Sequence, residues 1–284
     1  MKRNNNLTKK ITESSLMVAF ATVLSFIKLV EMPYGGSVTL ASMLPIVIVS
    51  YRHGIIFGLA SGGVYAAIQQ LLGLSTLSYF TTWQSILAVI LLDYVIAFTI
   101  TGLGGIFRSR LGLGSLSSSK RAGVEFAVGM VFVCLLRYVC HTVAGATVWA
   151  GLSIPTEAAL IYSVSYNATY MLPETVIASL VAFWIGSEID FSKSLPTRYP
   201  PSQESGADTA SVVLPKISML LIVLCVVFDT IMIAPYLQNA ETGEFTFASL
   251  GDVAWVAVII VSIILIVAAV IMAIVARIRA KSQA

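Results

Sequence analysis

Long apolar runs, separated by loops that hold most of the charged residues, constrain this chain more than any other feature. A helix needs about 20 mostly apolar residues to cross the hydrocarbon core of a bilayer. Charged residues make up 11% of the chain, whereas a soluble domain has about 25%. The sequence therefore predicts an all-α polytopic membrane protein. It has eight expected spans, the second of them short, over roughly residues 14–33, 40–51, 54–73, 84–106, 122–149, 157–186, 214–236 and 250–276.

The basic residues predict how these spans are oriented, because cytoplasmic loops are enriched in Lys and Arg. With the N-terminus inside, every Lys and Arg except Lys28 and Arg137 falls at an inner position. The basic N-terminus and the run behind it resemble a secretory signal, but no small-x-small cleavage site follows and Lys28 interrupts the run. We therefore expect a retained first helix, a cell-membrane location and both termini in the cytoplasm.

The polar content of the chain changes after the sixth expected span. Residues 189–213 are rich in Pro, Ser and mixed charges and predict an inner linker. The two spans that follow carry few ionisable residues, and only Asp229 lies away from their ends. We therefore predict a six-span substrate-binding unit at 1–188 and an accessory transmembrane hairpin with a basic tail at 214–284.

A stripe of unusual residues marks the fifth expected span. Arg137, His141, Gly145 and Trp149 are spaced four residues apart, so on a helix they rise about 6 Å per step along one face. Ionisable side chains at membrane depth face protein or a water-filled cavity. The stripe is therefore predicted to form one wall of a small-molecule pocket.

Two other expected spans bring polar groups to the same depth. Asp93 and Tyr94 lie about 15 Å below the outer surface at 1.5 Å per residue, where a carboxylate is costly unless it is paired. The sixth expected span has Asn167 beside a second four-residue repeat, which consists of Tyr162, Tyr166, Tyr170 and Glu174. We expect Asp93, the stripe and this span to face one cavity.

Each of these residues also has a simpler interpretation. Asp93 and Arg137 could form a buried structural ion pair. His141 could be a hydrogen-bonded core residue, and Trp149 could belong to the aromatic belt at the membrane interface. Their common face favours a pocket over these separate explanations.

The predicted pocket suits a flat, polar, cationic ligand. A carboxylate complements a protonated or amine-bearing ring, and aromatic faces hold cations. The chain has no G-x-x-x-x-G-K-[ST] sequence and so no ATPase site of its own, and it lacks G-x-S-x-G and H-E-x-x-H. Its three cysteines show no metal-ligand spacing. We expect a binding protein with no enzymatic activity, metal or cofactor.

Several stretches between roughly residues 10 and 190 resemble the thiamine-specific S-components of energy-coupling-factor (ECF) transporters. They are Tyr34-Gly-Gly-Ser-Val-Thr-Leu with Pro45, Tyr51-Arg-His-Gly54, Leu92-Asp-Tyr94, Arg137-Tyr-Val-Cys-His141 with Gly145 and Trp149, and Tyr162 with Asn167. The resemblance implies a six-helix bundle that captures thiamine from outside the cell. It also implies that the bundle docks on a coupling membrane protein with two ATP-binding subunits.

The resemblance also implies individual roles for the pocket residues. Asp93 would face the aminopyrimidine, and His141 and Trp149 would sandwich the rings. Arg137 would lie near the hydroxyethyl or phosphate end of the ligand. Hydrogen-bonding, lining and space-making roles would fall to Tyr162, Asn167, Tyr65, Trp83, Tyr94 and Gly145. A lid would comprise Tyr34, Gly35 and Gly36.

The first expected span would supply the face that docks on the coupling protein. Ser15 and Ala19 are small residues four positions apart, and such pairs allow close helix packing in lipid. Ordinary packing within the protein is the alternative interpretation of the pair.

Four features depart from the family pattern. The docking pair is Ser15 and Ala19 where the family has two alanines. The family's acidic pocket residue is a Glu, so Asp93 is one methylene shorter. Gly35 and Gly36 stand where some members place a Trp, and the hairpin at 214–276 has no counterpart in the pattern. Two other functions stay open: an S-component for another vitamin or a thiamine precursor, and a structural or assembly membrane protein.

Overall fold

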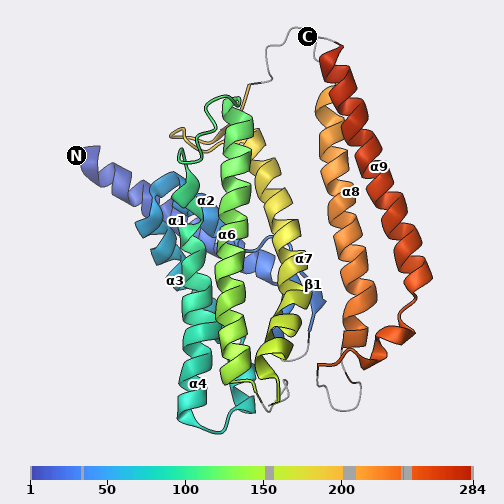
Figure 1. Cartoon of the computed structure of the whole chain (residues 1–284). Helices are drawn as coiled ribbons and strands as arrows, with labels where there is room; N and C mark the ends of the chain where they lie inside the picture. Colours follow the sequence, from blue (N-terminus) through green and yellow to red (C-terminus); the bar gives the residue numbers. More distant parts are fainter. Residues whose placement is uncertain are drawn as a thin grey trace.

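The computed structural model describes residues 2–32, 35–150, 157–200, 209–237, 239 and 245–282. Its long helices stand side by side as a bundle, with the last two set against one side of it (Figure 1). The principal α-helices are α1 (Lys2–Ser25), α2 (Leu44–His53), α3 (Ile55–Leu72), α6 (Ser118–Thr147), α7 (Ala159–Glu188), α8 (Thr209–Ile233) and α9 (Trp255–Lys281). The all-α membrane fold that the sequence predicts is confirmed.

Six helical segments in the described part of the chain are long and apolar enough to cross a membrane. They are Ile55–Leu72, Trp83–Phe107, Ser118–Thr147, Ala159–Glu188, Ala210–Leu237 and Trp255–Ala280. The expected count of eight spans is therefore not reproduced, and both missing spans belong to the first 53 residues. The six segments still make this a multi-pass membrane protein.

The second expected span, 40–51, is a short buried helix. The helix α2 has 10 residues, which span about 15 Å at 1.5 Å per residue, half the thickness of the hydrocarbon core. Its residues Leu44 to Tyr51 are all buried. An apolar run of this length is typical of a core helix covered by protein on every side.

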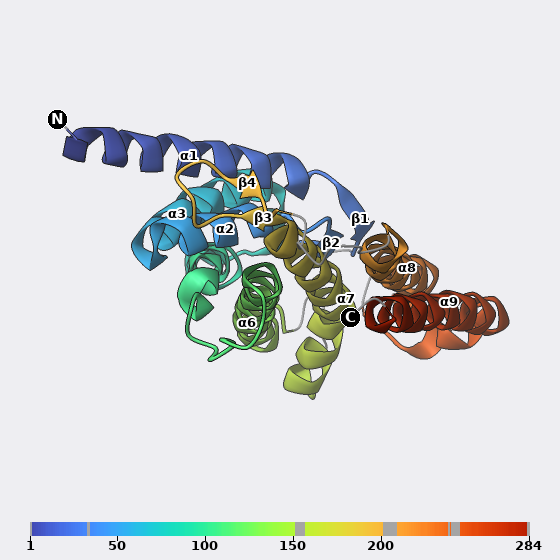
Figure 2. The ribbon, with the colours of Figure 1, turned by 90° about the horizontal axis from the view of Figure 1, so that it is seen from above.

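The first expected span, 14–33, also takes another form. The helix α1 ends at Ser25, and the chain then forms strands β1 (Lys28–Glu31) and β2 (Ser37–Thr39). The strands pair antiparallel, with Val30 opposite Val38. Seen from above, α1 lies lengthwise across the bundle while α6 is seen nearly end-on (Figure 2). Pro33 and Tyr34, at the tip between the strands, lie outside the described residues.

The segment that corresponds to the fourth expected span changes its helical type three times. It runs through α4 (Trp83–Val89), a π-helix η3 (Ile90–Ile96), α5 (Ala97–Thr99) and a 3₁₀-helix η4 (Ile100–Phe107). Its C-terminal half packs backbone to backbone on its neighbours: a Cβ atom on Gly129 of α6 would lie 2.1 Å from the Gly104 carbonyl oxygen. Small residues are what allow such close contact in membranes. The π-helix holds Asp93, and π segments are frequent at functional sites.

Charged groups join several elements at the end of the bundle where α2 ends. Glu13 of α1 accepts from Arg52 of α2, with 2.8 Å between Nη2 and Oε2, and lies 2.7 Å from His53 Nε2. Arg52 also donates to the Phe191 carbonyl at 2.8 Å. That carbonyl belongs to the connection after α7, which carries strands β3 (Ile189–Asp190) and β4 (Thr197–Arg198). The contacts hold α1, α2 and this connection together.

The helices α8 and α9 form a hairpin that lies alongside α7 (Figures 1 and 2). Ser218 donates to the Ala269 carbonyl at 2.8 Å, and Ser262 donates to the Asp229 carboxylate at 2.6 Å. Asp229 is thus paired within the hairpin. Lys216 joins it to α7 through Glu188 at 2.6 Å. The division at 188 and 213 stays a prediction; in the structure α7 ends at Glu188 and α8 begins at Thr209.

Candidate functional site

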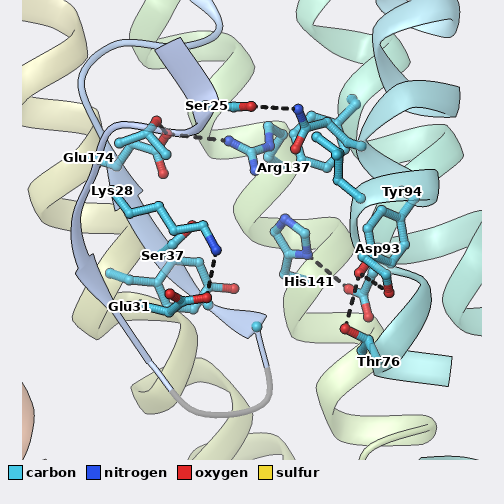
Figure 3. A pocket seen from close by; sticks show the side chains of 18 of the residues that line it. Ser25, Lys28, Glu31, Ser37, Thr76, Asp93, Tyr94, Arg137, His141 and Glu174 are labelled. Carbon is cyan, nitrogen blue, oxygen red and sulfur yellow. Dashed lines mark hydrogen bonds and ion pairs between the residues drawn. The ribbon is translucent and has the colours of Figure 1, made fainter. Parts of the chain in front are cut away.

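A cavity of about 310 Å³ lies between the β1–β2 hairpin and helices α3, η3, α6 and α7. Its walls carry polar groups from all of these elements (Figure 3). Small-molecule sites typically occupy 300 to 1,000 Å³ and combine apolar walls with a few placed polar groups. The cavity therefore has the size and lining of a small-ligand site.

The first polar cluster of the cavity is centred on Asp93. Its Oδ1 lies 2.8 Å from His141 Nδ1, and its Oδ2 accepts from Trp149 Nε1 at 2.9 Å. The π-helix supplies the carboxylate, while α6 and the turn behind it supply the two rings. A carboxylate in its ionised form only accepts, and His141 Nδ1 then donates to it. Asp93 thus fixes the orientation of both rings.

His141 keeps one ring nitrogen for a ligand. The Nε2 atom is buried and has no hydrogen-bond partner in the structure. Because a buried polar atom without a partner is costly, such an atom facing a cavity indicates a group that a ligand can satisfy. Figure 3 shows the imidazole between Asp93 and Arg137.

A second polar cluster surrounds Arg137. Its Nη1 lies 3.8 Å from Glu174 Oε1, and its guanidinium carbon lies 4.5 Å from the centre of the Phe98 ring. Glu174 is 2% exposed and also accepts from Thr39 Oγ1 at 2.9 Å. The guanidinium Nε atom has no partner. Each of the two clusters therefore contributes one carboxylate to the cavity.

These contacts correct the simpler interpretation of Asp93 and Arg137. The two residues do not form an ion pair with each other, since Asp93 is bonded to His141 and Trp149 while Arg137 lies against Glu174. Helical spacing placed Arg137 and His141 on one face but could not show which helices they face. The pairing follows from the packing of η3 and α7 on opposite sides of α6.

Most of the residues predicted for the pocket line the cavity. All four stripe residues do so, as do the predicted Asp93, Tyr94, Tyr65, Asn167, Gly35 and Gly36. Tyr166 and Tyr170, which were not named as site residues, line it too. The resemblance implied that the Asn167 amide is available to a ligand. In the structure this amide forms hydrogen bonds within the protein instead. Its Nδ2 donates to the Ser163 carbonyl at 2.9 Å, and its Oδ1 accepts from Tyr170 at 2.5 Å.

Two predicted pocket residues are not among those that line the cavity. Trp83 is 70% exposed at the start of α4. Tyr162 lies behind the wall, where it packs with the buried cluster that contains Trp149 and lies 6.4 Å from Phe245 between ring centres. The predicted lid residue Tyr34 lies outside the described residues.

Sequence reasoning left out Glu174 as a site residue, although the signal was present. It is the last member of the four-residue repeat on α7 and an acidic residue inside an apolar run. An intramembrane carboxylate is by default a candidate functional group. The lining groups Lys28 and Glu31 form an ion pair at 2.5 Å. They were not predicted as site residues, because they fall near the outer end of the first expected span, 14–33.

The fold and the cavity together define a class: a multi-pass membrane protein that encloses a small polar ligand among its helices. A family model described as thiamine transporter protein matches residues 11–191. The chain belongs to this thiamine transporter family, and thus to a family of transporters rather than enzymes. The helices α8 and α9 lie beyond the matched residues.

Similar proteins are found among characterised sequences and solved structures. The thiamine transporter ThiT of Bacillus subtilis (strain 168) is 33% identical over 175 residues, which are 61% of this chain and 87% of that protein. ThiT of Lacticaseibacillus paracasei is 27% identical over 180 residues, 60% of this chain and 83% of that protein. The structure of ThiT from Listeria monocytogenes has a TM-score of 0.51 at 22% identity, and the match covers 64% of this chain and 94% of that chain. The last comparison supports the fold.

Proposed function

We propose that this protein binds thiamine in the cavity between η3, α6 and α7, as the S-component of an ECF transporter in the cell membrane. The observation that carries the proposal is the Asp93–His141–Trp149 cluster in a cavity of about 310 Å³, in a chain of the thiamine transporter family. Thiamine has a cationic thiazolium ring, an aminopyrimidine and a hydroxyl group.

The chemistry of the cavity complements each of these parts. A thiazolium cation is favoured near a carboxylate and against an aromatic face. The buried His141 Nε2, which has no partner, is positioned to exchange a hydrogen bond with the aminopyrimidine. The Arg137 Nε–H is a donor for the hydroxyl or for a phosphate. Free thiamine, its phosphates and its precursors differ at that end of the molecule.

Thiamine titration followed by tryptophan fluorescence tests the proposal. Of the four tryptophans, Trp149 lines the cavity and Trp184 is 44% exposed elsewhere. We expect saturable quenching at micromolar thiamine or below, kept in Trp184→Phe and largely lost in Trp149→Phe. Pyridoxine, thiamine phosphates and the aminopyrimidine precursor serve as competitors. An absence of saturable quenching in the unaltered protein would refute thiamine binding.

The proposal includes partners: a coupling membrane protein and two ATP-binding subunits. The exposed face of α1 supports it, since Ser15 and Ala19 lie on that face together with apolar side chains such as Leu16 and Phe20, which are 64% and 52% exposed. We expect Ala19→Trp to abolish ATP-driven uptake in vesicles that contain all subunits, while thiamine binding is kept. Uptake at the unaltered rate would exclude this face.

A further inference from the structure

The connection between α8 and α9 reaches the wall of the cavity, although both helices lie beyond the residues matched to the family. Phe245 in this connection is 3% exposed. Its ring centre lies 5.5 Å from that of Tyr166 on α7, with the planes at 81°, and 6.4 Å from that of Tyr162. Edge-to-face contacts of this kind favour one relative orientation of the rings.

The Phe245 ring is itself held in place. The Thr246 N–H donates to the Leu237 carbonyl at 3.1 Å, which joins the two ends of the connection. Ala234, Leu237 and Phe245 belong to the same buried apolar cluster as Met32 next to β1. The hairpin is further joined to α7 by the Lys216–Glu188 ion pair. Phe245 is therefore a fixed contact of the bundle.

Tyr166 transmits this contact to the cavity. It lines the cavity together with Gly36. A Cβ atom on Gly36 would lie 3.1 Å from Tyr166 Oη and 2.8 Å from Tyr170 Cδ1. Gly36, directly before β2, thus rests on the two tyrosines, and Phe245 supports Tyr166 from behind.

From this arrangement we infer that Phe245 is a positioning residue that retains the ligand: through Tyr166 it holds the cavity wall and Gly36 in place. The α8–α9 hairpin then has a role in the binding of thiamine, so the inference rests on the proposed function. Removal of the Phe245 side chain would leave a space behind Tyr166, into which the tyrosine ring could move. Small displacements of binding groups weaken binding steeply.

Two measurements on the full-length protein test the inference. The first is the rate of thiamine dissociation by stopped-flow fluorescence. We expect Phe245→Ala to speed dissociation by about ten-fold and to change association little, because changes within one interface act mostly on dissociation. Phe245→Leu fills most of the space, so it should restore most of the slow dissociation.

The second measurement needs no ligand: amide hydrogen exchange in residues 35–40. We expect Phe245→Ala to speed exchange there, since local opening reports lost packing. Phe191→Ala is the matched control, because Phe191 is a comparably buried ring, 8% exposed, at the end of the bundle where α2 ends. It should change neither exchange in 35–40 nor thiamine dissociation.

The outcomes separate the two proposals. Unchanged exchange in Phe245→Ala, or equal effects of Phe245→Ala and Phe191→Ala, would overturn the role of Phe245 whether or not thiamine binds. Normal thiamine binding with unchanged dissociation in Phe245→Ala would also overturn it and leave the proposed function intact. An unaltered protein that fails to bind thiamine, with faster exchange in Phe245→Ala, would refute thiamine as the ligand and keep Phe245 as the support of the wall.

Discussion

At the scale of single residues, Asp93 organises the site because each carboxylate oxygen has a different ring as its partner. Oδ1 holds His141 and Oδ2 holds Trp149. One acidic side chain thus fixes an imidazole and an indole from the other side of the cavity. A carboxylate inside a membrane protein is costly unless it is paired in this way.

Asp93→Asn tests this residue directly. An amide accepts through only one oxygen, so it cannot serve both rings, and the attraction for a cation is lost. We expect thiamine affinity to fall by about 2 kcal/mol, roughly thirty-fold in Kd. Asp229→Asn is the matched control, because Asp229 is also intramembrane but is bonded to Ser262 within the α8–α9 hairpin. Equal affinities of the two variants would contradict the role of Asp93.

At the scale of elements, Glu13 holds the middle of α1 against α2. Burial raises the pKa of its carboxyl, but the hydrogen bonds and charges of Arg52 and His53 outweigh this effect and leave the pKa below the ordinary value of 4.5. A carboxyl with a lowered pKa stabilises the folded state above its ordinary pKa, and that contribution is lost as the pH falls through the folded value.

Glu13→Gln should therefore lower the thermal stability of the detergent-solubilised protein at pH 7. The contribution is under about 1 kcal/mol, since the carboxylate is partly exposed and screened by solvent. The difference from the unaltered protein should shrink as the pH is lowered below 4.5, where Glu13 itself becomes protonated. Glu157→Gln, at an exposed position, is the control for a lost surface charge. A difference that grows with acidity would contradict this assignment.

At the scale of the whole molecule, the six candidate spans and the opening segment together keep both termini on one side in the proposed topology. The contact of Glu13 with Arg52 places the middle of α1 beside the end of α2, at one end of the bundle. The β1–β2 hairpin between them lines the cavity. The chain therefore leaves that end of the bundle and comes back to it within the first 53 residues, although this part does not form the two expected membrane spans.

Cysteine labelling tests this topology in a variant whose three native cysteines are replaced by alanine. We expect a membrane-impermeant maleimide to label Ser78→Cys, between α3 and α4, in intact cells. Ser115→Cys, before α6, should be labelled only after the cells are permeabilised. Both positions are exposed, so the difference reports the side of the membrane. The reverse pattern would place the cavity mouth in the cytoplasm.

The sequence by itself determined the class of this protein and one wall of its cavity. Apolar length and scarce charge are local properties, and they were sufficient to predict a helical membrane protein. The spacing of Arg137, His141, Gly145 and Trp149 follows from helix geometry alone, and the structure places all four at one cavity. Similarity along 11–191 supplied the family.

Only the tertiary structure decided which groups meet across helices. Periodicity reports which residues share a face but not which helix that face meets. For this reason the pairing of Asp93 with His141, the position of Glu174 beside Arg137 and the contact of Phe245 with Tyr166 were absent from the predictions. The short helix α2 was mistaken for a span for a related reason: burial by protein and burial by lipid select the same apolar side chains, and only packing distinguishes them.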